Sequence, residues 1–178
     1  MKATLVLTLI GIDRPGLVNA ISTTTALHGA NWEASRMARL GGRFAGLLLV
    51  TLEPARAAAL QRDLEGLSEL GLKVVVEQSA HVEPRRRWQT VKLELLGTDQ
   101  LGIMRQVAAA LSERGINVDE LSTECASAPI SGGDVFKVSA LLACPPSVDL
   151  DELRSELERV ANDLMVDINL EPRGTTES

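Results

Sequence analysis

Hydrophobic and polar residues alternate in a short run at the start of the chain and again near its middle. The first run covers residues 4–9 and the second residues 91–95. Such alternation is typical of a β-strand that buries one face. Each run leads into a Gly-x-Asp turn and then into apolar residues at helical spacing, most clearly over residues 103–114. The pattern therefore predicts a strand followed by a helix at two places.

The two turns are rough copies of each other. GIDRPGLV begins at Gly11, and GTDQLGIM begins 86 residues later at Gly97. The same offset aligns five residues that turn or cap a chain: Gly11 with Gly97, Asp13 with Asp99, Gly16 with Gly102, Gly29 with Gly115 and Asn31 with Asn117. This many matches in register indicates an internal structural repeat.

The remaining pattern completes each copy. We expect second strands over residues 31–40 and 117–125, and third strands over residues 44–52 and 136–143. Leucine-rich amphipathic helices and final alternating strands follow in both copies, the strands at residues 72–76 and 166–170. The order βαββαβ, read twice, predicts an α+β protein of two ferredoxin-like domains. Each would have an antiparallel sheet with its helices on one face.

We expect the first domain to span residues 1–80 and the second residues 90–172. The segment HVEPRRRWQ, residues 81–89, is interpreted as a linker, and the polar tail 173–178 is expected to fray. The hairpin between the second and third strands is short in the first copy and long in the second, where it reads SAPISGGD over residues 127–134.

Composition narrows the function. The net charge is -6 and aromatic residues make up only 2% of the chain, which argues against direct nucleic-acid binding, because phosphate contacts need clustered cations. The one basic run, residues 85–87, lies in the expected linker. Two widely spaced cysteines predict neither a disulfide framework nor a metal site. Without a signal peptide or a membrane-spanning stretch, the sequence predicts a cytoplasmic protein.

The duplicated turn suggests an anion site. Asp13 and Asp99 are expected as helix N-caps, with Pro15 in the first helical turn and Gly16 or Gly102 leaving room beside the free amides. A helix start of this kind binds small anions such as an amino-acid carboxylate. From turn chemistry alone, a capped strand-to-helix joint with no ligand is the commoner case. Arg14 would clamp a carboxylate or be solvated.

Two asparagines begin the expected second strands. Asn31 and Asn117 would lie near the first strand, where an amide can donate to a carboxylate and accept from an ammonium. A post-helix turn residue is an equally good interpretation of each. His28 and His81 have no nucleophile or carboxylate at a telling spacing, and no catalytic or phosphate-binding motif occurs. The sequence therefore predicts no enzyme, cofactor or metal.

These residues resemble a known family. GIDRPGLV, followed by GAN at residues 29–31, resembles the ACT domain, a small βαββαβ module that typically binds amino acids at this turn. Two copies with no other domain are similar to the glycine cleavage system transcriptional repressor family. The segment TECASAPISGGDVF, residues 123–136, resembles the second domain of that family.

The resemblance implies an amino-acid-responsive regulatory protein, a co-regulator of glycine metabolism that acts on a partner transcription factor and forms a homodimer through its sheet edges. An alternative is a regulatory or scaffolding subunit of a metabolic enzyme, acting by contact without sensing a ligand. The implied ligand positions are Asp13, Arg14, Pro15, Gly16, Leu17 and Asn31. The second copy lacks the Arg-Pro pair and implies a weaker site at Asp99, Gln100, Leu101, Gly102, Ile103 and Asn117.

Overall fold

The chain folds into two compact units, Met1–Val82 and Glu83–Ser178. The computed structural model describes residues 2–79, 88–127 and 134–175. The basic run 85–87, His81 and most of the expected hairpin 127–134 lie outside the described residues. Among the described residues, no helix has the length and apolar character to span a membrane.

The first unit follows the expected order of elements. Its strand β1 leads through the turn into helix α1, and two 3-10 turns, η1 and η2, flank helix α2. The elements are β1 (Ala3–Ile12), α1 (Leu17–Leu27), β2 (Asn31–Leu40), β3 (Arg43–Leu52), η1 (Pro54–Arg56), α2 (Ala57–Glu65), η2 (Gly66–Leu70) and β4 (Leu72–Gln78).

The second unit repeats this order with a longer second helix. Its N-cap Asp149 accepts hydrogen bonds from the amides of Asp151 and Glu152, which satisfies donors that the first helical turn leaves unpaired. The elements are β5 (Gln89–Thr98), α3 (Ile103–Glu113), β6 (Asn117–Ser127), β7 (Asp134–Cys144), α4 (Leu150–Leu164) and β8 (Val166–Thr175).

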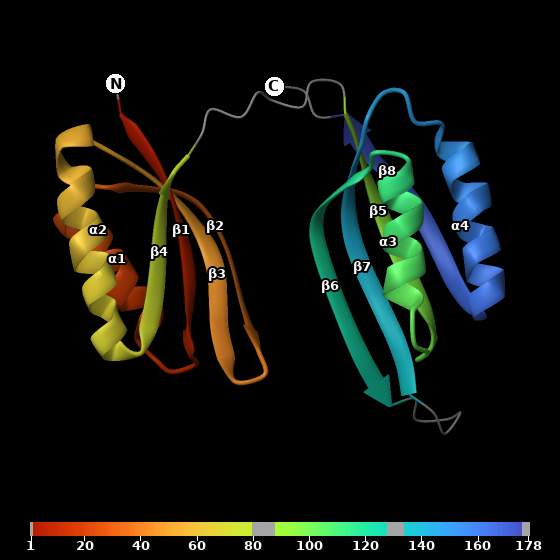
Figure 1. Ribbon diagram of the computed structural model, residues 1–178, viewed down its shortest axis with the longest axis horizontal. Helices are drawn as coiled ribbons and strands as arrows, with labels where there is room; N and C mark the ends of the chain where they lie inside the picture. Colours follow the sequence, from red (N-terminus) through yellow and green to blue (C-terminus); the bar gives the residue numbers. More distant parts are fainter. Residues whose placement is uncertain (1, 80–87, 128–133, 176–178) are drawn as a thin grey trace. The chain divides into compact units, whose positions relative to one another are not determined.

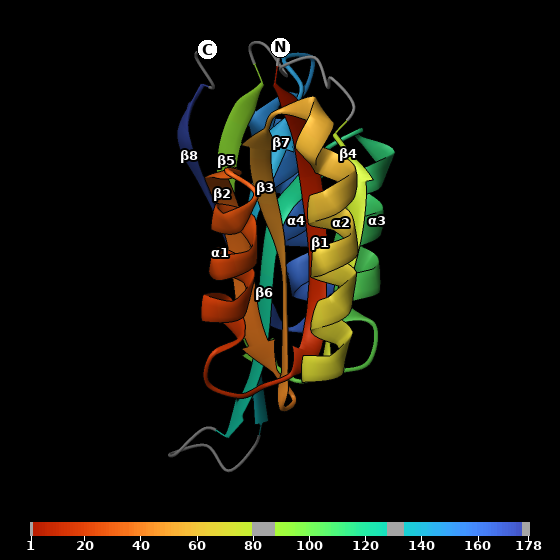
Figure 2. The same ribbon diagram turned by 90° about the vertical axis from the view of Figure 1, so that its left-hand side faces the viewer.

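Each unit holds a four-stranded antiparallel sheet, in the order β2-β3-β1-β4 and β6-β7-β5-β8. Figure 1 shows both helices of each unit on one face of its sheet. Figure 2 shows α1 and α2 side by side over the first sheet. The predicted pair of ferredoxin-like units is therefore confirmed.

Two separate hydrophobic cores hold the units together. In the first, alternate residues of β1 and β3, such as Leu7 and Leu48, have no exposed surface and pack against Ile21 of α1 and Leu60 of α2. The second core repeats this with aliphatic residues of β5, α3, β7 and α4. With so few aromatic residues, interdigitated aliphatic side chains provide almost all of the buried apolar area that stabilises each unit.

Two expected boundaries differ from the structure. Gln89, the last residue of the expected linker, is already paired with Cys144 as the first residue of β5. At the other end, β8 runs on to Thr175, so Arg173 lies in a strand and not in a frayed tail. The physical reason is that β5 is ten residues long, and its backbone groups pair with β8 whatever the side chains are.

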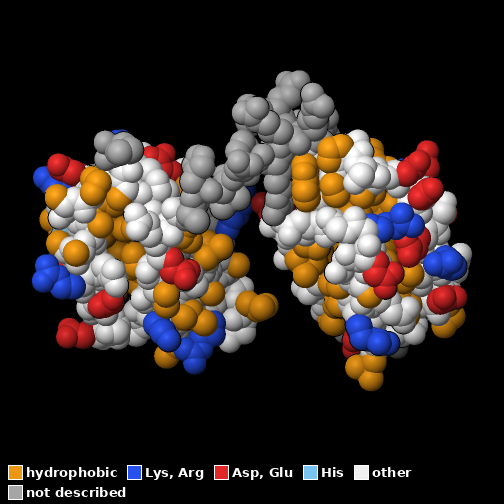
Figure 3. Space-filling model, turned by 45° about the horizontal axis from the view of Figure 1, so that its top comes forward, with side chains coloured by type: hydrophobic (Ala, Val, Ile, Leu, Met, Phe, Trp, Pro, Cys, Tyr) orange, Lys and Arg blue, Asp and Glu red, His pale blue; other side chains and the backbone are white. Residues whose placement is uncertain are grey.

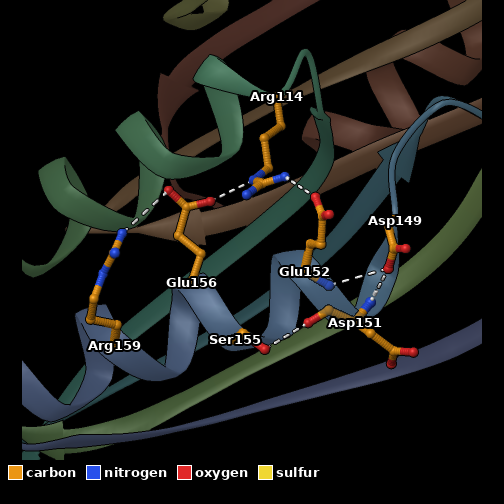
Figure 4. Close-up of polar contacts among 7 residues, drawn as sticks. All are labelled: Arg114, Asp149, Asp151, Glu152, Ser155, Glu156 and Arg159. Atoms are coloured by element: carbon orange, nitrogen blue, oxygen red, sulfur yellow. Dashed lines mark hydrogen bonds and ion pairs between the residues drawn. The ribbon is translucent and has the colours of Figure 1, made fainter.

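The end of the first helix is tied to the second helix in both units. His28 Nε2 lies 2.7 Å from Asp63 Oδ2 of α2. At the corresponding place Arg114, directly after α3, pairs with Glu156 and Glu152 of α4 (Figure 4), and these ion pairs hold its pKa above the usual value. Different residue types thus make the same helix-to-helix contact.

The sheet face opposite the helices, here called the open face, differs between the units. Strand register places Ile10, Ala45 and Lys73 side by side on the first open face. The matching positions on the second are Leu96, Lys137 and Asp167. Figure 3 shows hydrophobic side chains among charged ones on the visible surface of both units. The first open face is the more apolar, because it also carries Leu47 and Val75, about half exposed.

Candidate ligand-binding turn

The turn between β1 and α1 does not place an aspartate at the helix N-cap. The N-cap residues are Gly16 and Gly102, both with φ 95°, and no side chain caps α1 or α3. The prediction that Asp13 and Asp99 cap these helices was wrong. The residue directly before each helix is left-handed, and glycine adopts that conformation at low cost. The helix therefore begins after the glycine, which lies three residues beyond the aspartate.

Asp13 turns toward the edge strand β2 instead. Its Oδ2 lies 2.8 Å from Arg39 Nε, and its amide donates to the Gly42 carbonyl over 3.0 Å. Its carboxylate side chain is 34% exposed. This ion pair fixes the turn to the end of the β2–β3 hairpin and leaves the outer carboxylate surface open.

Asp99 makes the corresponding contacts, but its side-chain partner is a thiol and not a guanidinium. Its Oδ2 accepts from Cys125 Sγ over 3.7 Å, and its amide donates to the Asp134 carbonyl over 3.0 Å. Desolvation, followed by the charge of Asp99, raises the pKa of the Cys125 thiol. A neutral thiol thus stands where the first unit has a guanidinium.

Arg14 also has a structural partner. Its side chain donates to the carbonyl of Leu70, at the end of η2. Gln100 makes the same tie by donating to the Leu164 carbonyl over 3.1 Å. Pro15, expected in the first helical turn, lies before the N-cap, because the helix begins only at Leu17. The Arg-to-Gln difference therefore removes a charge and keeps the hydrogen bond.

The residues after the glycines belong to the cores. The side chains of Leu17 and Ile103 are buried, so only their backbone amides are available to a ligand. Leu101, in contrast, is fully exposed. The first intrahelical bond of α1 runs from the Ala20 amide to the Gly16 carbonyl, which leaves the amides of residues 17–19 without a helical partner.

The start of α1 therefore has the properties of an anion site. Three amide donors and the positive end of the helix dipole point in one direction. A Cβ placed on Gly16 would meet nothing within 4 Å, so the approach is open. Asp13 could receive an ammonium beside it. The geometry suits a small zwitterion.

Asn31 does not lie beside this turn within its own unit. Strand register places it level with Thr51 and Thr4, at the far end of the sheet from Asp13. Asp13 follows Thr4 by nine residue steps along extended chain, which is roughly 30 Å. Asn31 thus lies level with the start of the first strand and not with the turn, because helix α1 returns the chain to the opposite sheet end.

Each asparagine contacts a carboxylate two residues further on. Asn31 donates to Glu33 over 2.8 Å, and Asn117 donates to Asp119 over 2.6 Å. Both acids sit at a bulge in the strand. The hydrogen bond from Thr51, followed by that from Asn31, lowers the pKa of Glu33. Each asparagine keeps its amide oxygen as an acceptor.

Sequence reasoning missed Arg39 and Glu33. The repeat offset of 86 aligns Arg39 with Cys125 and Glu33 with Asp119, so a comparison of every strand position could have found both. Among the described residues, no group of three or more His, Cys, Asp or Glu residues could hold a metal.

Comparison with known proteins agrees with the fold. Residues 3–77 match the ACT domain family model. The glycine cleavage system transcriptional repressor of Escherichia coli is 24% identical over 163 residues, which are 90% of this chain and 85% of the repressor. The crystal structure of an unknown protein from Galdieria sulphuraria has a TM-score of 0.86 at 34% identity. It covers 97% of this chain and 99% of that protein.

An enzyme is also similar to this chain. Phosphoserine phosphatase SerB2 of Mycobacterium tuberculosis is 27% identical over 177 residues, which are 97% of this chain. The chain spans only 42% of the length of that phosphatase.

Proposed function

The chain belongs to the ACT domain family, as a tandem ACT-domain regulatory protein related to the glycine cleavage system transcriptional repressor, and from this premise we propose that it responds to an amino acid. In the proposal it is a cytoplasmic homodimer without catalytic activity. It binds a partner transcription factor of glycine metabolism and leaves DNA to that partner. The similarity to the repressor along 90% of the chain and the net charge of -6 support this.

The observation that carries the proposal is the open, uncapped start of α1 beside Asp13 and Arg39. The ligand carboxylate would accept from the amides that follow Gly16 and from the guanidinium of Arg39, whose Nε contacts Asp13. The ligand ammonium would lie against Asp13. Arg14 and Pro15 would shape the turn, and Leu17 would contribute its amide.

Asn31 would come from a second copy of the chain. Strand β2 is a sheet edge, and edge strands are ready for pairing. If the β2 strands of two copies pair antiparallel about a two-fold axis, the Asn31 end of one reaches the Leu40 end of the other, next to its turn. Because the two groups lie at opposite ends of one sheet, this pairing would create a composite site.

The second turn is the weaker candidate in this proposal. It keeps Asp99, Gly102 and Asn117, but Cys125 replaces the cation at position 39 and Gln100 the cation at position 14. Leu101 and Ile103 add no polar side chain. A carboxylate there would have only the helix amides, so its binding would be weaker.

Calorimetric titration with glycine, serine, alanine and the branched amino acids tests the proposal. Glycine has five heavy atoms, so at about -1.5 kcal/mol for each its dissociation constant cannot fall below low micromolar, and titrations must reach millimolar ligand. We expect saturable binding that Asp13→Ala and Asn31→Ala abolish. The matched controls Asp99→Ala and Asn117→Ala should retain it. Folded protein that binds none of these amino acids would contradict the proposal.

The similarity to phosphoserine phosphatase SerB2 supports a second candidate, a regulatory or scaffolding subunit of a metabolic enzyme that works by contact alone. It predicts no ligand response. Affinity capture with the full chain would then recover a metabolic enzyme and no transcription factor, and amino acids would not change the yield. Recovery of a transcription factor in an amino-acid-dependent manner would exclude this candidate.

A further inference from the structure

The open face of the second unit contains a hollow of about 510 Å³, within the roughly 300–1,000 Å³ typical of small-molecule sites. All four strands of the sheet contribute to it. It lies within one unit and on the face away from the helices, so it is separate from the turn. The side chains that matter are Glu94, Leu96, Glu124, Lys137 and Asp167.

Strand register orders four of these side chains in one row across the sheet. Glu124 of β6 is opposite Lys137 of β7, which is opposite Leu96 of β5, which is opposite Asp167 of β8. Neighbouring strands lie about 4.8 Å apart, so Lys137 and Asp167 are separated by roughly 10 Å. Leu96, 46% exposed, forms an apolar floor between them.

The charges in this row are not engaged with one another. Glu94, in the next row, is held by Lys92, with 2.5 Å between Oε1 and Nζ. Within the described residues, the side chains of Glu124, Lys137 and Asp167 make no hydrogen bond or ion pair. Across the sheet the row therefore reads anion, cation, apolar side chain and second anion, each on the next strand.

We propose that this hollow binds a basic α-amino acid, one with a terminal ammonium group on an aliphatic side chain. Lys137 would hold the α-carboxylate, and Glu124, on the next strand, the α-ammonium. The aliphatic chain would lie over Leu96 and bring the terminal ammonium to Asp167. A ligand of net charge +1 would balance the net charge of -1 on these three side chains.

The first unit shows that the fold alone does not create this arrangement. Its row at the same register is Ala38, Ala45, Ile10 and Lys73. Both positions that would hold the α-amino and α-carboxylate groups are alanine, and a cation replaces the terminal acid. This row of the first open face therefore lacks the anion–cation pair that would recognise the α-amino and α-carboxylate groups, so the proposed site is specific to the second unit.

The test is calorimetry on the full chain with lysine, norleucine and 1,5-diaminopentane as probes. Norleucine lacks the terminal ammonium, and the diamine lacks the carboxylate. Lysine should bind saturably and up to about fivefold more tightly than either, since each exposed charge contact contributes up to about 1 kcal/mol. Equal affinity for lysine and norleucine, or no binding of lysine, would overturn the proposal.

Variants then assign the contacts. Asp167→Asn should remove the preference for lysine over norleucine, and Lys137→Met should remove the preference for lysine over the diamine. Asp163→Asn on α4 and Lys73→Met on the first open face are matched controls that should change neither ratio. Asp13→Ala should also leave lysine binding intact, which separates this site from the proposed turn site. A preference for lysine that persists in Asp167→Asn would contradict the assignment.

Discussion

The turn between β1 and α1 and the turn between β5 and α3 make corresponding hydrogen bonds but carry different charges. In both, a left-handed glycine starts the helix and the residue two positions earlier donates to the end of the second helical segment. In both, the aspartate contacts the same position of the edge strand, β2 or β6. That position is Arg39 in one unit and Cys125 in the other. The contacts that hold the turn in place are thus kept, and the cations that a ligand could use are not.

On the open faces it is the second unit, and not the first, that carries the anion–cation pair a ligand could use. There the first unit has alanine where the second carries Glu124 and Lys137, and a lysine, Lys73, where the second carries Asp167. Neither difference disturbs a core residue. The comparison teaches that one fold can keep its packing in two copies while different surfaces of each copy become available for binding.

The largest expected loss of stability comes from substitutions in the cores, and it tests whether the two cores are independent. Leu7 and Leu93 occupy matching positions of β1 and β5, with at most 1% of either side chain exposed. Leu7→Ala and Leu93→Ala should each destabilise by about 2–5 kcal/mol, because each leaves a cavity. Amide hydrogen exchange should show the loss only in the unit that carries the change. Equal loss of protection in both units would contradict independent cores.

The turn glycines should respond equally in stability. At φ 95° an alanine is strained, although its Cβ would meet nothing within 4 Å at either position. Gly16→Ala and Gly102→Ala should therefore each cost about 1–2 kcal/mol, measured by denaturant unfolding. If one substitution cost more than twice as much stability as the other, the two turns would not be equivalent.

The hydrogen bond from the Arg14 side chain to the Leu70 carbonyl should survive replacement of the arginine by glutamine. Arg14→Gln should retain most of the stability, since Gln100 makes this bond in the second unit. Arg14→Ala should lose about 1 kcal/mol in the same unfolding experiment. If the glutamine and alanine variants were equally destabilised, the hydrogen bond would not be interchangeable.

The smallest effect is a pH dependence at the bulge of β2. Folding lowers the pKa of Glu33 from 4.5, so Glu33 contributes stability above that pH and loses it as the pH falls through the lowered value. Glu33→Gln should flatten the stability profile below about pH 4.5. Thr51→Val should do so in part. An unchanged acid profile in Glu33→Gln would contradict the assignment.

Much of the fold could be predicted because it rests on local patterns. Alternation and helical spacing indicated the order of elements, and β3 ends at Leu52 as expected. The boundary at Arg173 could not be predicted, because β8 continues by backbone pairing with β5, which leaves no trace in side-chain polarity.

The site was less predictable than the fold. Gly16 was recognised as leaving room for a ligand, but its left-handed role as the N-cap displaced Asp13 from that position. The separation of Asn31 from the turn depends on strand direction in three dimensions, and so does the contact between Asp13 and Arg39. Turn chemistry alone carries no information on either.

The central claim is that the turn of one copy and Asn31 of another form one amino-acid site. The most direct test is calorimetry on dimers from co-expressed Asp13→Ala and Asn31→Ala chains. Alone, neither variant should bind. Half of the mixed population should be heterodimers with one intact site each, so about a quarter of the wild-type binding stoichiometry should return. No binding in the mixture, with wild-type protein binding normally, would contradict the claim.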